Sequence, residues 1–106
     1  MDKEAFVSAL TLCNRARDFV YGMGTVSQAL KSSKAKSVYA AQDISEKTRK
    51  EITFLCLKYN TKLFHTPFTM DEYWFLTGKR TGIFAVTQQG FSDKLSALAC
   101  EETPNL

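Results

Sequence analysis

The chain has 106 residues, 44% of them hydrophobic and 24% charged, a size and balance that suit one soluble globular domain and are too small for two. No apolar run approaches the roughly 20 residues needed to cross a bilayer, and the charged start Met1-Asp2-Lys3-Glu4 lacks a signal-peptide core. The formal net charge is only +3, but twelve basic residues stand against six acidic ones from Arg15 to Arg80, and this +6 span suits a polyanionic partner or an ordinary solvated surface.

The first part of the chain predicts a helix, a short strand and a second helix. From Glu4 to Arg17, apolar residues recur at the three- and four-residue spacing of one helical face. They are Phe6, Ala9, Leu10, Cys13 and Ala16. The β-prone segment Phe19-Val20-Tyr21 is closed by Gly22. A second helix is expected to start near Gly24-Thr25 and to end in a basic turn over 31–36.

The middle of the chain predicts two strands around a third helix. Residues 37–41 indicate a buried strand, and Ser45 is a good N-cap for a helix that ends at Asn60. Residues 62–65 indicate the next strand, because Pro67 disfavours helix just before it.

The last part predicts a helix, a strand and a final helix. Thr69-Met70-Asp71-Glu72 is a capping box that starts a helix ending at Gly78. Residues 82–87 give the strongest strand pattern, and a last helix is expected after Gly90. Alternating helices and strands with short connections predict a sheet covered by helices on both faces. We expect one domain over residues 1–100 and a flexible tail over 101–106.

Residue types that carry catalysis are few and scattered. The cysteines Cys13, Cys56 and Cys100 are odd in number and far apart, so buried thiols are expected rather than a zinc or redox pair. The only histidine, His65, has no evident nucleophile beside it and is expected to be a strand-end residue. We expect no catalytic site, no metal and no cofactor, and therefore not an enzyme.

Two glycine clusters fall short of nucleotide-binding motifs. Gly22-Met23-Gly24 opens a helix after a strand, but Ser27 stands where a dinucleotide fingerprint has its third glycine. Residues 77–82 match only part of a phosphate loop, since Tyr73 replaces its first glycine and Arg80 its magnesium-binding hydroxyl.

Two further positions have both a binding and a structural interpretation. Asp43 follows a strand, where sites of α/β proteins often lie, or it is a turn or capping residue. Lys79 and Arg80 lie in a loop between Gly78 and Gly82, which either presents charge and forked donors to phosphate or is a solvated turn.

Four segments in order along the chain carry a resemblance to a known family. They are 22–30 (GMGTVSQAL), 34–38 (KAKSV), 41–44 (AQDI) and 79–86 (KRTGIFAV). In this order and spacing they resemble the kink-turn-binding ribosomal proteins, the archaeal "seven-Ae" and eukaryotic "thirty-e" group, and in particular its bacterial YlxQ-like branch. The resemblance spans about Glu4 to Leu98, nearly all of the chain.

The resemblance implies an α/β fold, namely a three-layer α/β/α sandwich with a four-stranded mixed sheet. It also implies one RNA-binding face made of three segments. The start of the second helix meets sheared G·A pairs, the loop after the second strand approaches a flipped nucleotide, and the loop before the last strand supports the RNA bend. The corresponding residues are Gly24, Thr25, Gln28 and Lys31; Gln42, Asp43 and Ile44; and Lys79, Arg80, Thr81 and Gly82.

The second-helix segment departs from the family pattern. Kink-turn binders carry Asn, Glu and Lys where this chain has Gly24, Thr25 and Gln28. Thr25 has no carboxylate to accept from guanine, and Gln28 has no charge for phosphate. Because each good bidentate base contact is worth about 1–3 kcal/mol of discrimination, we expect RNA binding with relaxed kink-turn specificity.

Two functions are therefore weighed. The first is an RNA-binding, ribosomal-protein-like accessory protein of the bacterial cytoplasm, a monomer that recognises a folded or bent RNA element. Its partner would be structured RNA, with ribosomal RNA or the ribosome as candidates, and neither a membrane nor a small-molecule substrate. The alternative is a protein-protein interaction module on the same fold without RNA binding.

Tyr73-Trp74-Phe75 bears on the choice, because three adjacent helical positions cannot all face one core. The exposed ring then either docks a partner or covers the sheet edge.

Overall fold

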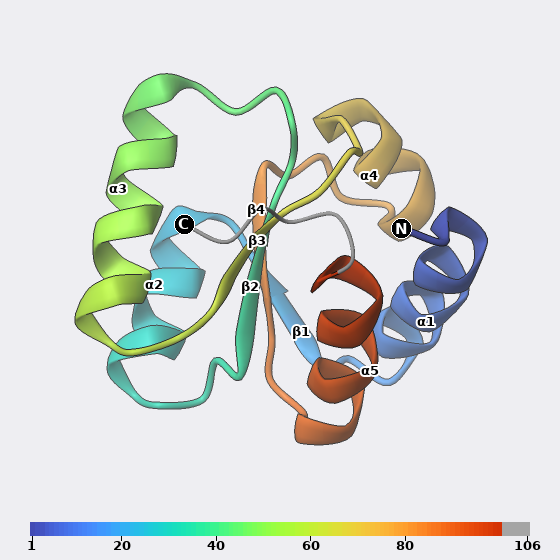
Figure 1. Ribbon diagram of the computed structural model, residues 1–106, viewed down its shortest axis with the longest axis horizontal. Coiled ribbons are helices and arrows are strands. Elements are labelled where there is room, and N and C mark those ends of the chain that lie inside the picture. The colour runs from blue at the N-terminus through green and yellow to red at the C-terminus, as the bar shows by residue number, and fades with distance from the viewer. Residues whose placement is uncertain (101–106) are drawn as a thin grey trace.

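Helices and strands alternate through residues 1–100, the part of the chain that the computed structural model describes (Figure 1). The helices are α1 (Lys3–Arg15), α2 (Met23–Lys31), α3 (Glu46–Lys58), α4 (Met70–Thr77) and α5 (Gln89–Cys100). The strands are β1 (Phe19–Tyr21), β2 (Ser37–Ala40), β3 (Leu63–His65) and β4 (Ile83–Val86). The tail expected over 101–106 lies outside the described residues, as does the side chain of Cys100.

Local capping chemistry explains where α3 begins and where α4 begins and ends. The Ser45 hydroxyl accepts from the N–H of Thr48 at 3.1 Å, which confirms the predicted N-cap of α3. The predicted capping box at Thr69 and Glu72 is present with both of its hydrogen bonds. Gly78 ends α4 in the left-handed region at φ 79°, a conformation that glycine adopts at little cost.

Several element boundaries differ from the sequence prediction by one or two residues, and three helix ends among them have clear local causes. Helix α1 ends at Arg15 because Arg17 is left-handed (φ 59°) and closes a Schellman-type end, which leaves Ala16 exposed. Helix α2 begins before Gly24, since the carbonyl of Gly22 already accepts from Val26. Helix α5 begins at Gln89, before Gly90, because the Gln88 side chain caps it by accepting from the N–H of Phe91 at 2.7 Å.

The strand order is β1-β4-β2-β3, with β2 and β3 parallel and β4 antiparallel to both of its neighbours. The register aligns Tyr21 with Phe84, Ala40 with Ile83, and Ala40 with His65. Strands β1, β2 and β3 therefore point the same way, and β4 starts where the other three end.

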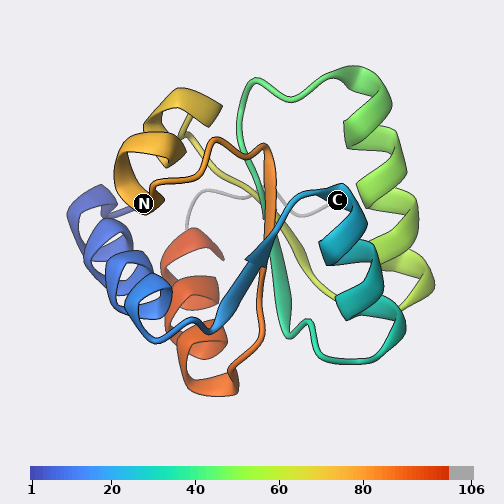
Figure 2. The same ribbon diagram turned by 180° about the vertical axis from the view of Figure 1, so that it is seen from behind.

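Side chains that alternate along the strands build two cores, one on each face of the sheet. Val38 and Ala40 of β2 pack under α2 and α3, while Tyr39 points to the face that α1, α4 and α5 cover. Figures 1 and 2 show the two helical layers on either side of the sheet. The α/β class and the three-layer sandwich with a four-stranded mixed sheet are therefore confirmed.

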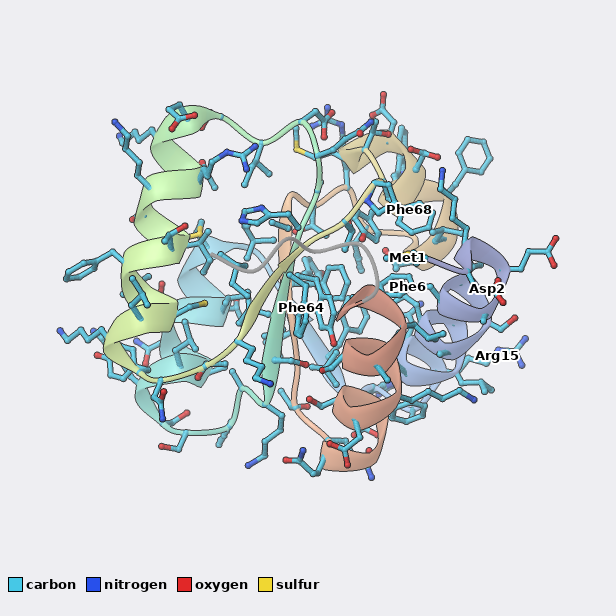
Figure 3. The ribbon with its side chains drawn as sticks, in the orientation of Figure 1. Met1, Asp2, Phe6, Arg15, Phe64 and Phe68 are labelled. Atoms are coloured by element: carbon cyan, nitrogen blue, oxygen red, sulfur yellow. The ribbon has the colours of Figure 1, made fainter. Side chains whose placement is uncertain are left out.

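The larger core is rich in aromatic rings. Tyr39 stacks on Phe64 and on Phe84, with ring centroids 5.4 and 5.1 Å apart. Phe6 of α1 stacks on Phe68 at 5.6 Å (Figure 3). Offset and edge-on ring pairs of this kind add to the stabilisation from burial and hold the helical layer in register on the sheet.

The two cysteines whose side chains are described are buried, as predicted. Burial raises the pKa of the Cys13 and Cys56 thiols to about 12, so both stay protonated and unreactive near neutral pH. None of the helices in the described part combines the length and apolar character that crossing a bilayer requires.

Candidate nucleic-acid interface

The strand directions bring four connections to one end of the sheet, the upper end in Figure 1. They are residue 22, residues 41–45, residues 66–69 and residues 78–82. Backbone hydrogen bonds tie them together: Gly22 N–H donates to the Ile83 carbonyl at 3.0 Å, and Ala41 N–H to that of Gly82 at 2.8 Å. The segments singled out from the sequence before the third helix and the last strand therefore adjoin each other and the start of α2.

A hollow of about 310 Å³ opens between these connections. Its lining consists of Gly22, Met23, Ile44, Ser45, Thr48, Met70, Thr81, Gly82 and Ile83. The two methionines and two isoleucines give it an apolar floor, and the loops around it supply polar and charged groups. An apolar hollow with a polar rim is the usual form of a binding site.

Helix α2 presents the first predicted segment to solvent. Gly24, Thr25, Gln28 and Lys31 are all exposed. Because they recur at three- and four-residue spacing, they share one side of the helix. Gly24 and Thr25 lie in the first turn, beside the hollow-lining Met23, whereas Lys31 lies in the last turn, about 10 Å further along the axis.

The start of α2 is also a source of backbone donors. Its N-cap, Gly22, has φ 90° and no side chain that could accept from the first-turn N–H groups. Uncapped N–H groups and the helix dipole favour an anionic or acceptor ligand at this point. The start of α2 can therefore donate to an anionic or acceptor ligand without any charged side chain.

The loop after β2 contributes Gln42, Asp43 and Ile44. Gln42 and Asp43 are exposed, and Ile44 is half-buried in the floor of the hollow. An Asp43 carboxylate oxygen accepts from the N–H of Met70 at 3.0 Å, at the first residue of α4. This bond supports the capping interpretation of Asp43, and it fixes α4 against the loop.

The loop before β4 contributes two exposed cations. The Arg80 Nε lies 2.9 Å from a carboxylate oxygen of Asp71, and both side chains remain more than half exposed. The Lys79 Nζ lies 5.5 Å from the centre of the Tyr21 ring, over the end of β1. An exposed ion pair of this kind contributes little to stability, so Arg80 can exchange its carboxylate partner for a phosphate.

The other two residues of that segment, Thr81 and Gly82, have structural roles. Thr81 is buried, and its hydroxyl donates to the carbonyl of Ile83 at 2.6 Å and accepts from the N–H of the same residue. A Cβ on Gly82 would lie only 2.7 Å from the Ile44 Cγ2 and 3.3 Å from the Met70 Sδ. The absence of a Cβ at Gly82 therefore lets this loop pack closely against Ile44 and Met70, and any larger residue would force a neighbour to shift.

Six residues that line the hollow were not predicted as site residues, namely Gly22, Met23, Ser45, Thr48, Met70 and Ile83. Ile83 begins β4, and each of the other five belongs to, or caps, the first turn of a helix that follows a strand. The three strands that precede these helices end at the same edge of the sheet. The helix starts could be recognised from the sequence, but grouping them at one edge requires knowing the direction of each strand.

His65 lies at the same edge but is not part of the lining. Its Nδ1 lies 3.3 Å from a guanidinium nitrogen of Arg49. Burial, followed by the charge of Arg49, lowers the pKa of His65, so the ring is neutral near pH 7. Among the described residues, no three His, Cys, Asp or Glu side chains are grouped so that they could hold a metal ion.

Three comparisons relate the sequence and the fold to known proteins. Residues 4–96 match the family described as ribosomal protein L7Ae/L30e/S12e/Gadd45. The "RNA-binding protein YlxQ" of Bacillus subtilis (strain 168) is 34% identical over 94 residues, which cover 84% of this chain and 89% of that protein. A solved structure of a protein with unknown function from Bacillus halodurans C superposes with a TM-score of 0.85 at 26% identity, covering 90% of this chain and 96% of that one.

Proposed function

The chain belongs to the ribosomal protein L7Ae/L30e/S12e/Gadd45 family, and from this premise we propose that it is an RNA-binding, ribosomal-protein-like protein that recognises a folded or bent RNA element. The observation that carries the proposal is the convergence of the start of α2 and the loops at 41–45 and 78–82 around one hollow, within a chain whose family match covers residues 4–96. The relative from Bacillus subtilis, named as an RNA-binding protein, supports the same conclusion.

Each part of the site suits a different part of a bent RNA. The uncapped N–H groups of α2 and the exposed Gln28 supply donors toward a groove or a phosphate. The apolar floor formed by Met23, Ile44 and Met70 suits the face of a nucleotide turned out of its helix. Lys79 and Arg80 flank the hollow and supply positive charge to the backbone at the bend.

We propose that the specificity for kink-turns is relaxed. Thr25 in the first turn of α2 and Gln28 in the second are exposed, where they can contact the edges of RNA bases. Neither carries charge, so their hydrogen bonds to base edges are neutral and weaker than those of a charged side chain. Attraction to the RNA backbone is then retained while base discrimination is reduced.

The remaining parts of the proposal concern context. The protein acts by binding alone, without catalysis, and works as a monomer in the cytoplasm. Ribosomal RNA or the ribosome is the first candidate target, a choice that the ribosomal-protein family supports. The comparisons give no support to the alternative of a protein-interaction module that does not bind RNA.

Crosslinking in the native cells, followed by sequencing of the attached RNA, tests the proposal directly. We expect one or a few structured RNA elements to be enriched over total cellular RNA. As a control, the same experiment is run on a variant in which Gln28 and Arg80 are both replaced by Glu, which reverses or adds charge on two sides of the hollow. If wild type and variant recover the same RNA in the same amount, or if neither recovers any, the proposal is wrong.

A further inference from the structure

Helix α4 exposes two large aromatic side chains that no part of the described fold requires to be there. Trp74 is 57% exposed and Phe75 94% exposed, whereas their neighbour Tyr73 is fully buried against Phe84. Trp74 and Phe75 line a second hollow, of about 340 Å³. Adjacent exposed rings beside a hollow indicate a contact surface rather than part of the core.

This surface adjoins the candidate RNA site. Trp74 follows Met70 by four residues, so the two side chains share one side of α4, one turn apart. Met70 lines the first hollow. Arg80 lies over the first turn of α4. Its Nη1 is 4.0 Å from the Met70 Sδ, and its Nε is 2.9 Å from the Asp71 Oδ1. The path from the hollow to Trp74 is therefore one helical turn long and passes a guanidinium group.

Arg80 is the group along this path that can bind the phosphate of a nucleotide. Of the two carboxylates in the first turn of α4, Asp71 is paired with Arg80, and Glu72 accepts from the N–H of Thr69 and keeps its negative charge. The guanidinium stays more than half exposed and can meet a phosphate. A single-stranded nucleotide is bound by this combination, a cation for the phosphate and an aromatic face for the base.

We propose that Trp74, with Phe75 beside it, is a stacking platform for an unpaired nucleotide of the bound RNA. The strand would leave the hollow at Met70, pass Arg80 and place a base on the indole ring. This proposal rests on the RNA-binding function proposed above and extends it, since it adds a single-stranded flank to the folded element as part of the target.

Trp74 is the only tryptophan of the sequence, so its fluorescence reports on this surface alone. The test uses two RNAs that share one bent element, one blunt and one with a short unpaired flank, and measures binding separately by mobility shift. Only the flanked RNA is expected to quench the fluorescence strongly. Replacing Trp74 by Ala should weaken binding of the flanked RNA by about fivefold to a hundredfold and leave the blunt RNA unchanged. Trp74→Phe should restore most of the loss.

Phe54→Ala on α3 is the matched control, because Phe54 is an aromatic ring 64% exposed on the opposite helical layer. It should change neither affinity. The stacking proposal fails, while RNA binding stands, if two results occur together. The Trp74→Ala variant binds both RNAs as tightly as the wild type, and the tryptophan fluorescence of the wild type does not change when the flanked RNA binds. If no RNA binds in any assay, both proposals fail. If Trp74→Ala lost binding to a defined protein partner while its RNA affinities stayed unchanged, the surface would be a protein-binding site, and the proposal would be overturned.

Discussion

Reversing both charges of the loop before β4 (Lys79→Glu with Arg80→Glu) should separate folding from RNA binding. Both side chains are exposed, and the ion pair between Arg80 and Asp71 is exposed as well. Such pairs contribute about 0–1 kcal/mol, and the new carboxylate adds a weak repulsion toward Asp71. We expect the free energy of unfolding to fall by about 1 kcal/mol or less, which lowers Tm by a few degrees in a domain of this size.

RNA affinity should fall much further, by about tenfold or more, because two attractive contacts become repulsive. If the wild type neutralises about four phosphates, log Kd against log salt has a slope of magnitude about 3.6, and the loss of two contacts halves it. Thermal melts and RNA titrations at several salt concentrations measure both effects. The change in slope identifies lost phosphate contacts, whereas a folding defect lowers the active fraction without changing the slope.

The matched control is Lys58→Glu with Lys62→Glu, which changes the charge by the same amount. Both lysines are exposed, and they flank the connection from α3 to β3 at the opposite end of the sheet. Lys47 would be a poorer control, because it adjoins Thr48 in the lining of the hollow. Equal losses from the two double variants would mean that only diffuse charge acts. If the Lys79 and Arg80 double variant bound RNA with the affinity of the wild type, the loop would not be part of the site.

Three further predictions concern specificity, packing and pH. A kink-turn and the same RNA with its G·A pairs changed to Watson–Crick pairs should bind within a hundredfold of each other in parallel titrations, because Thr25 and Gln28 lack charge; a larger preference would show that α2 reads bases strongly. Replacing Gly82 by Ala should lower the free energy of unfolding by about 1–3 kcal/mol in denaturant titrations, because the new Cβ would overlap Ile44; an unchanged midpoint would mean that the loops separate freely. Because the pKa of His65 is lower in the folded chain than in the unfolded one, the unfolded chain takes up this proton first as the pH falls. The free energy of unfolding should therefore decrease as the pH is lowered through about 6.5. His65→Gln should flatten that part of the pH profile, and identical profiles would contradict the inference.

The sequence predicted the order of the elements well, because strong local signals mark their ends. Ser45, Thr69 and Gly78 each act within a few residues of themselves, through a cap or a left-handed turn, and each is where it was expected to be. The small errors also have local causes, such as the left-handed Arg17 and the Gln88 side chain that caps α5.

The site was harder to predict because it depends on strand order. Nothing in residues 83–86 indicates that β4 lies between β1 and β2 and runs opposite to them, yet that arrangement brings the loops together. Thr81 and Gly82 were predicted on the RNA face from their positions in the family motif. Their hydrogen bonds and close contacts show roles that only the packed loops reveal.

The contact between the loops at 41–45 and 78–82 bears on whether the protein or the RNA changes shape on binding. The Gly82 carbonyl accepts from the N–H of Ala41, the Phe68 carbonyl accepts from the N–H of Gln42, and Asp43 accepts from the N–H of Met70. The loop at 41–45 is therefore tied to the loop at 78–82, to the connection at 66–69 and to the start of α4. A surface held in this way keeps its shape before and after its ligand arrives and loses little conformational entropy. On the RNA-binding proposal above, most of the change in shape on binding would then take place in the RNA. The protein's affinity for different RNAs will therefore follow how readily each RNA bends by itself.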